Sequence, residues 1–105
     1  MNGTKNQAKG TILLLVRGKT ALSADEIEYR MKERSPQFEA IPGLIQKYYI
    51  KTKNPGEYGG VYIWDSMKSV KAFKETNLAA TIAEAYELIE EPSTEIIDIM
   101  FELRD

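Results

Sequence analysis

The strongest constraint on the fold is a short, uninterrupted run of apolar residues, Ile12 to Val16, followed by Arg17 and Gly18. A half-solvated strand alternates apolar and polar residues, whereas this run is apolar at successive positions, which is typical of a strand covered on both faces. The run is far too short to span a membrane. The sequence therefore predicts a central strand here, inside a sheet whose two faces both need a cover.

A first helix is predicted from its start and stop signals. The segment Ser23-Ala-Asp-Glu26 has the S-x-x-E capping pattern, in which the serine oxygen and the glutamate carboxylate each bond a free backbone amide. The helix is expected to begin near Ala24 and to end before Pro42-Gly43. Pro36 lies inside it and lacks an N–H, so a bend or an interruption is expected at that residue.

A hairpin and a second helical region follow. Leu44 to Thr52 and Gly60 to Trp64 are rich in β-branched and aromatic residues and flank a turn, Lys53 to Glu57. A cap at Asp65 or Ser66 then predicts a helix. Its apolar residues recur at helical spacing and continue past a possible break at Asn77: Met67, Val70, Phe73, Leu78, Ile82, Tyr86 and Ile89.

Alternation of apolar and acidic residues from Ile96 to Leu103 predicts a last strand. The order of elements is then β-α-β-β-α-β, which predicts an α+β fold of ferredoxin-like type, an antiparallel sheet with both helices on one face. Residues 11–105 are expected to form one such domain behind a disordered N-terminal tail, residues 1–10.

Composition excludes several classes of chemistry. The 105 residues include no cysteine and no histidine, which removes disulfides, thiolate nucleophiles, Cys or His metal sites and the Ser-His-Asp triad. No metal or cofactor site is therefore expected. The net charge of −2 has no long block of one sign, so neither a nucleic-acid nor a membrane partner is indicated. The polar start of the chain lacks a signal sequence, which predicts a cytoplasmic protein.

The second face of the sheet predicts a homodimer. The expected strands carry large apolar residues at both parities, for example Leu13 with Leu14 and Ile63 with Trp64. Helices can cover only one face, so the other face would leave a large exposed apolar patch. Packing two sheets face to face in a homodimer removes that patch.

Three segments resemble a known family. They are Ile41-Pro-Gly-Leu-Ile-Gln-Lys-Tyr-Tyr-Ile50, Gly59-Gly-Val-Tyr-Ile-Trp-Asp-Ser66 and the helix with Val70 to Phe73. With them the chain resembles the YdhR-like monooxygenase family of the dimeric α+β barrel superfamily, over residues 11 to 103. The resemblance implies a homodimer in which two sheets close into a barrel, with a small apolar pocket between sheet and helices in each subunit.

The superfamily includes several activities, and the residues select among them. Haem-degrading members and chlorite dismutases use a histidine iron ligand, which this chain cannot supply. The antibiotic-biosynthesis monooxygenases are the better guide. They oxidise electron-rich phenols with oxygen and without metal or flavin, because the substrate supplies the electrons. Such chemistry needs a dry pocket with a few hydrogen-bonding or basic groups.

Five residues are the candidate substrate-binding set. Trp64 and Tyr62 share one face of a strand and could wall a flat aromatic ligand, with core packing as the ordinary alternative. Tyr48 and Tyr49 point to opposite faces, and Tyr48 is the one favoured for the pocket. Phe38 and Tyr86 lie on the helical stripes and could contact the same ligand or form only the core.

No residue can be assigned as catalytic from the sequence. Asp98 interrupts an apolar strand and could act as a base or lie at an open edge, and Arg17 could simply pair with an acid. Two functions therefore stay open: a cofactor-independent monooxygenase acting on a small aromatic or polyketide-like molecule, or a non-catalytic dimeric module that binds a small apolar ligand or a protein.

Overall fold

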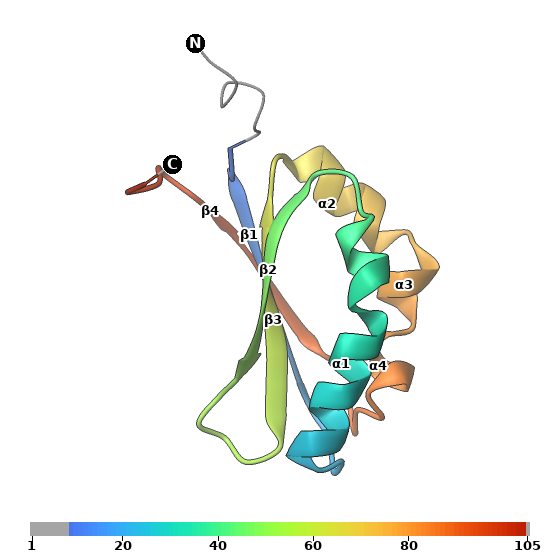
Figure 1. Cartoon of the computed structure of the whole chain (residues 1–105). Helices are drawn as coiled ribbons and strands as arrows, with labels where there is room; N and C mark the ends of the chain where they lie inside the picture. Colours follow the sequence, from blue (N-terminus) through green and yellow to red (C-terminus); the bar gives the residue numbers. More distant parts are fainter. Residues whose placement is uncertain (1–8, 105) are drawn as a thin grey trace.

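The computed structural model describes residues 9–104; the expected N-terminal tail falls mainly on residues 1–8, outside the described residues. Four strands form one antiparallel sheet in the order β2-β3-β1-β4. All the helices lie on one face of it (Figure 1). The elements in chain order are β1 (Ile12–Lys19), α1 (Ala24–Glu39), β2 (Leu44–Lys51), β3 (Glu57–Trp64), α2 (Met67–Lys74), α3 (Asn77–Ala80), α4 (Ile82–Ala85) and β4 (Ser93–Asp98). The predicted ferredoxin-like α+β fold is confirmed.

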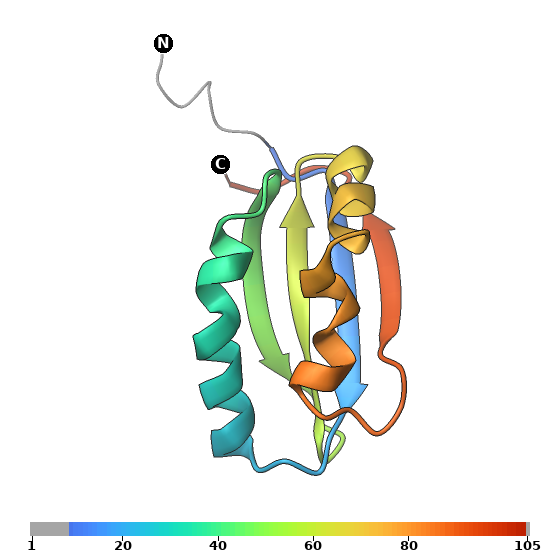
Figure 2. The ribbon, with the colours of Figure 1, turned by 90° about the vertical axis from the view of Figure 1, so that its right-hand side faces the viewer.

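The core lies between the sheet and the helix layer. Figure 2 shows α1 along the β2 side of that layer and α2 to α4 along the β1 side. Alternate residues of the two central strands point toward the helices, as the period of two requires. Aromatic rings dominate the core, and its buried members are Ile12, Leu14, Val16, Phe38, Tyr62, Trp64, Val70 and Phe73.

Local capping signals explain where two helices begin. The Ser23 hydroxyl accepts a hydrogen bond from the Glu26 amide at 3.2 Å, as predicted for the start of α1. The Glu26 carboxylate contacts Arg30 at 2.8 Å rather than returning to the cap. Ser66 caps α2 in the same way through the Ser69 amide.

Pro36 does not interrupt α1, which runs through it to Glu39. A proline leaves the carbonyl four residues earlier, here that of Lys32, without its usual amide donor. The Ser35 hydroxyl donates to this carbonyl at 2.9 Å. The side chain next to the proline thus replaces the lost backbone bond.

Two boundaries differ from the sequence prediction. The last strand is Ser93–Asp98, three residues earlier at its start than expected, because its partner β1 offers pairing positions only from Arg17 back to Ile12. The predicted helical stretch after Asn77 is divided into α3 and α4, and Leu88 then forms an isolated bridge with Thr20.

The sheet face away from the helices is apolar at its centre. In register, Leu13 lies between Ile63 of β3 and Ile97 of β4, and Leu15 lies beside Val61. Figure 1 shows this face without any covering element, and the chain after β4 leaves the sheet on the same side. None of the helices in the described part of the chain has the length and apolar character needed to cross a membrane.

Candidate functional site

A small cavity lies between the sheet and the helix layer. Its lining comes from the strands β1, β2 and β3, from α1 and from the segment that follows α4, and it includes Met31, Lys47, Tyr49, Tyr62 and Tyr86. Its volume is about 40 Å³, which is space for roughly two or three water molecules. A larger ligand can enter only where the cavity continues into a wider space.

That wider space is a groove between α1 and β2. The groove has a volume of about 410 Å³, within the usual range for small-molecule sites of roughly 300–1,000 Å³. Its lining is mainly apolar and shares Ile27, Met31, Tyr49 and Tyr58 with the cavity. The cavity is therefore the inner end of a ligand-sized groove, with Met31 and Tyr49 at the junction.

Lys47 is the most unusual residue of this region. Its Nζ lies 3.3 Å from the ring centroid of Phe38, 4.3 Å from that of Tyr49 and 4.5 Å from that of Tyr62. No carboxylate lies within ion-pair distance of it in residues 9–104. Burial, with a smaller contribution from the charge of Arg34, lowers the pKa of Lys47 to about 7. Aromatic faces stabilise an ammonium less well than water and a carboxylate do together.

Register explains why this lysine points inward. Lys47 pairs with Tyr62, and Tyr49 pairs with Gly60, so both side chains face the helices together with the buried residues of β3. Gly60 leaves the space that the lysine chain occupies, because a Cβ there would lie 3.0 Å from Lys47 Cε and 3.0 Å from the Tyr62 ring. Its neighbour Gly59 allows the close approach of β3 to the Val16 carbonyl.

Arg34 brings a second cation to the same layer. It lies on the inward stripe of α1, with its guanidinium 5.8 Å from the Phe38 ring and 5.4 Å from the Tyr86 ring. It donates to the Leu78 carbonyl at 3.0 Å, but among residues 9–104 neither its buried Nε nor the buried Tyr86 hydroxyl has a hydrogen-bond partner. Unpaired buried polar atoms are costly. Tyr86 lines the cavity, so an oxygen of a ligand bound there would be a partner for its hydroxyl.

Burial keeps three of the tyrosines around the cavity, Tyr49, Tyr62 and Tyr86, protonated at neutral pH. Burial raises the pKa of Tyr49 to about 12 and also raises the pKa values of Tyr62 and Tyr86. These hydroxyls can therefore donate hydrogen bonds and do not act as bases near neutral pH.

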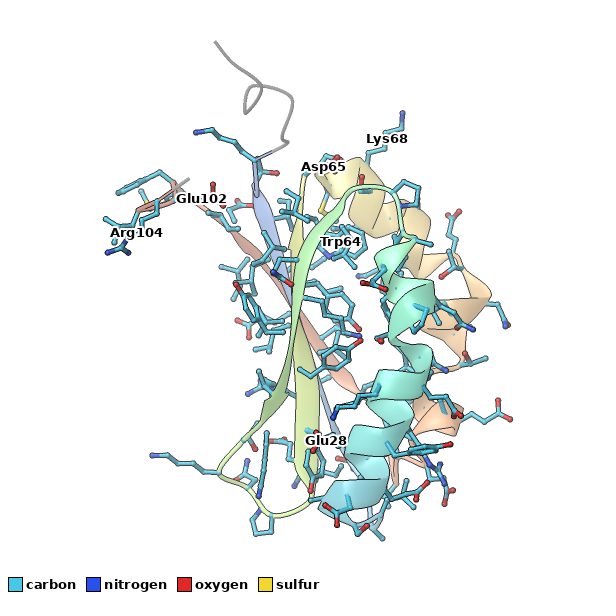
Figure 3. All side chains as sticks on the ribbon, in the orientation of Figure 1. Glu28, Trp64, Asp65, Lys68, Glu102 and Arg104 are labelled. Atoms are coloured by element: carbon cyan, nitrogen blue, oxygen red, sulfur yellow. The ribbon has the colours of Figure 1, made fainter. Side chains whose placement is uncertain are left out.

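The structure brings together only some of the residues predicted as a site. Tyr62 and Tyr86 line the cavity. Trp64 is fully buried behind it, stacked at 5° and 6.1 Å on Tyr62, and Figure 3 shows its ring on the helix side of the sheet. Phe38 of α1 contacts Tyr62 and Lys47. It is not among the residues that line the cavity, and it lines a separate, more open pocket between the end of α1 and the start of β2.

Tyr48 lies on the opposite face of the sheet and is 55% exposed, so Tyr49 rather than Tyr48 borders the cavity. The reason is a β-bulge: Leu44 pairs with Trp64, yet Gln46 pairs with Ile63, so the parity of β2 changes after Leu44. Asp98 is exposed on the edge strand β4, and Arg17 pairs in register with Ser93. Neither is among the residues that line the cavity.

Sequence reasoning missed Lys47, Tyr49 and Arg34. The sequence signals for the two cations were weak. Lys47 lies inside a predicted strand, and Arg34 lies at helical spacing from Ile27 and Phe38, on the apolar face of the predicted helix. A long cationic side chain at such a position is usually solvated. Only the bulge and the strand register identify Lys47 as inward-facing, and the contacts of Arg34 with Phe38 and Tyr86 do so for the arginine.

The lowered pKa of Lys47 predicts a pH dependence of stability. Between pH 7 and its ordinary value of 10.5, the unfolded chain holds the lysine proton and the folded chain does not. The free energy of unfolding should therefore rise with pH across this window, by at most about 1.4 kcal/mol per pH unit. Lys47→Met should flatten the rise and stabilise the protein near pH 6, whereas Lys51→Met on the same strand should change neither. Urea titrations between pH 6 and 9 measure both; an unchanged slope in Lys47→Met would contradict the assignment.

A protein family matches most of the chain. The profile described as "Putative mono-oxygenase ydhR" matches residues 13–101. The chain belongs to this family. A search of curated proteins finds no match to this YdhR-family chain.

Solved structures share its fold at low sequence identity. A protein of unknown function from Nitrosomonas europaea is 17% identical, with a TM-score of 0.76 over 94% of this chain and 98% of that one. SnoaB, a cofactor-independent oxygenase from Streptomyces nogalater, is 12% identical, with a TM-score of 0.71 over 91% and 99%. The ActVA-Orf6 monooxygenase of Streptomyces coelicolor, in complex with nanaomycin D, is 11% identical, with a TM-score of 0.70 over 91% and 93%.

Proposed function

We propose that this YdhR-family chain is a cofactor-independent monooxygenase that binds a small, electron-rich aromatic or polyketide-like molecule in the α1–β2 groove. The observation that carries the proposal is the site itself: an apolar groove of ligand size that leads to a small cavity walled by aromatic rings, with one amine inside it. The fold shared with a cofactor-independent oxygenase and with a monooxygenase that holds nanaomycin D supports it.

The reaction proposed needs no external reductant. A methylene group activated by neighbouring phenolic rings is converted to a carbonyl: one oxygen atom of O₂ enters the substrate, and the other leaves as water with the two methylene hydrogens. The substrate supplies all four electrons. The protein's part is to hold the molecule in a place with little water and to support the ionised, electron-rich form.

Filling the junction of groove and cavity should stop the reaction. Met31 lines both spaces, so the Met31→Trp variant should lower oxygen consumption with anthrone by about tenfold or more, since its ring displaces the substrate. Oxygen uptake and formation of anthraquinone measure turnover, and ¹⁸O₂ should label the product carbonyl.

The matched controls are Met31→Leu, which keeps the volume, and Tyr48→Phe, which changes only the far face of the sheet. Both should keep the activity. Binding of anthrone that Met31→Trp abolishes, but without oxygen uptake by the parent chain, would favour a non-catalytic ligand-binding module instead.

We also propose that the chain works as a homodimer that joins two sheets by their bare faces. The support is the apolar centre of that face, where Leu13, Leu15, Val61 and Ile63 lie side by side in register. Tyr48 beside Val61 and Ile97 beside Leu13 extend the patch to both edge strands, and they are 55% and 41% exposed. A contiguous apolar patch of this kind is typical of an interface.

A further inference from the structure

We propose that Lys47 accepts the proton of the substrate's hydroxyl group, so that the substrate is a phenol or an enol that is bound as its oxyanion. This inference rests on the proposed function and names the chemical class of the ligand and the residue that ionises it. It starts from the position of one amine and from the groups around it.

The Lys47 amine is placed to meet a ligand. Its side chain lines the cavity, and it also lines a second, more open pocket between the end of α1 and the start of β2, next to Phe38. Three aromatic rings surround its Nζ at 3.3 to 4.5 Å. In the described residues the ion pairs join Arg30 and Lys32 to glutamates on the protein's outer side, and none involves Lys47. A desolvated lysine without a carboxylate is the arrangement that makes an amine available as a base.

Of the other titratable groups around this amine, four cannot take a proton in its place. They are Arg34 of α1, Tyr49 of β2, Tyr62 of β3 and Tyr86 after α4. An arginine stays protonated in proteins, and a protonated tyrosine hydroxyl does not accept a second proton near neutral pH. The exposed Glu39 of α1 borders the more open pocket that Lys47 also lines, but it forms no ion pair with Lys47 in residues 9–104. Lys47, whose pKa is lowered to about 7, is partly deprotonated at neutral pH and can therefore accept a proton.

The proton transfer conserves charge and atoms. The hydroxyl O–H bond breaks, the oxygen keeps the electron pair, and the Lys47 amine becomes an ammonium ion beside the new oxyanion. This ion pair then lies near the guanidinium of Arg34 and the unpaired hydroxyl of Tyr86. The oxyanion is therefore a negatively charged partner for the Lys47 ammonium and the Arg34 guanidinium, neither of which has a carboxylate partner in residues 9–104. It also raises the electron density of the ring, which is the form that reacts with oxygen.

Absorbance of a bound phenol tests this inference without any turnover. The probe is 4-cyanophenol, whose phenol and phenolate forms absorb differently and which is mainly protonated near neutral pH when free. Bound to the parent chain it should show the phenolate spectrum. Lys47→Met should bind it at least about tenfold more weakly, and the bound part should show the phenol spectrum. Lys71→Met, which removes an exposed lysine of α2 that lines neither the cavity nor the groove, should behave as the parent chain.

The methyl ether of the same probe, 4-methoxybenzonitrile, separates the two proposals. It has no proton to give, so its affinity should differ little between the parent chain and Lys47→Met. A phenol probe that binds the parent chain in its neutral form would overturn the role of Lys47 and leave the groove as a binding site. If neither phenol nor ether binds, the groove is not the site and both proposals fail.

Discussion

The Val61→Lys variant is expected to be a monomer at concentrations at which the parent chain is a dimer. Val61 lies at the centre of the bare sheet face, paired with Leu15 on one side and Tyr48 on the other. In a face-to-face dimer each copy would bury one new ammonium group without a partner. A buried, unpaired charge costs about 3 kcal/mol or more. The two in a dimer together cost about 6 kcal/mol or more, which corresponds to a dissociation constant about 10,000-fold higher.

Sedimentation at several concentrations measures this change. The new lysine faces solvent in the separated chain, so circular dichroism of the monomer should remain that of the folded parent. Ala72→Lys adds the same charge on an exposed position of α2, in the helix layer, and should leave the dimer intact. A parent chain that is itself monomeric, or a Val61→Lys variant that remains dimeric, would show that the bare face has another role.

The sequence was sufficient for the order of elements because local signals and the core pattern agree. The caps at Ser23 and Ser66, the Pro42-Gly43 stop and the apolar run in β1 each predict the element that the structure contains. The end of β4 could not be predicted, because alternation continues to Leu103 although β1 offers no partner beyond Ile12. Pairing, which is a tertiary property, decided that boundary.

The candidate site was less predictable for a similar reason. Tyr62 was identified from the strand face that it shares with Trp64, and Tyr86 from its helical stripe, and both line the cavity. The choice between Tyr48 and Tyr49 depended on the parity of β2, and a single bulge after Leu44 reversed it. The same bulge turns Lys47 inward. A one-residue shift changes the face of every later side chain in a strand, and a bulge leaves no reliable mark in the sequence.

Truncation of Trp64 is expected to have the largest effect on stability. Trp64 has no exposed surface, and its ring packs at 5.3 Å from Phe73 and at 6.1 Å from Tyr62. Trp64→Ala would leave a cavity in the middle of the aromatic core and should lower the free energy of unfolding by about 3–5 kcal/mol. The loss is a large fraction of the total for a domain of this size.

Trp64→Phe separates packing from hydrogen bonding at the same position. The indole Nε1 is buried without a partner in the described structure, so its removal loses no bond and relieves an unpaired donor. The phenylalanine variant should therefore lose only about 1 kcal/mol or less. Urea unfolding followed by circular dichroism is the suitable measurement, because Trp64 is the chain's one tryptophan and fluorescence would be lost with it. Equal losses in the two variants would mean that the indole N–H makes a stabilising bond, for example to a ligand or a water, and that Trp64 belongs to the site rather than to the core behind it.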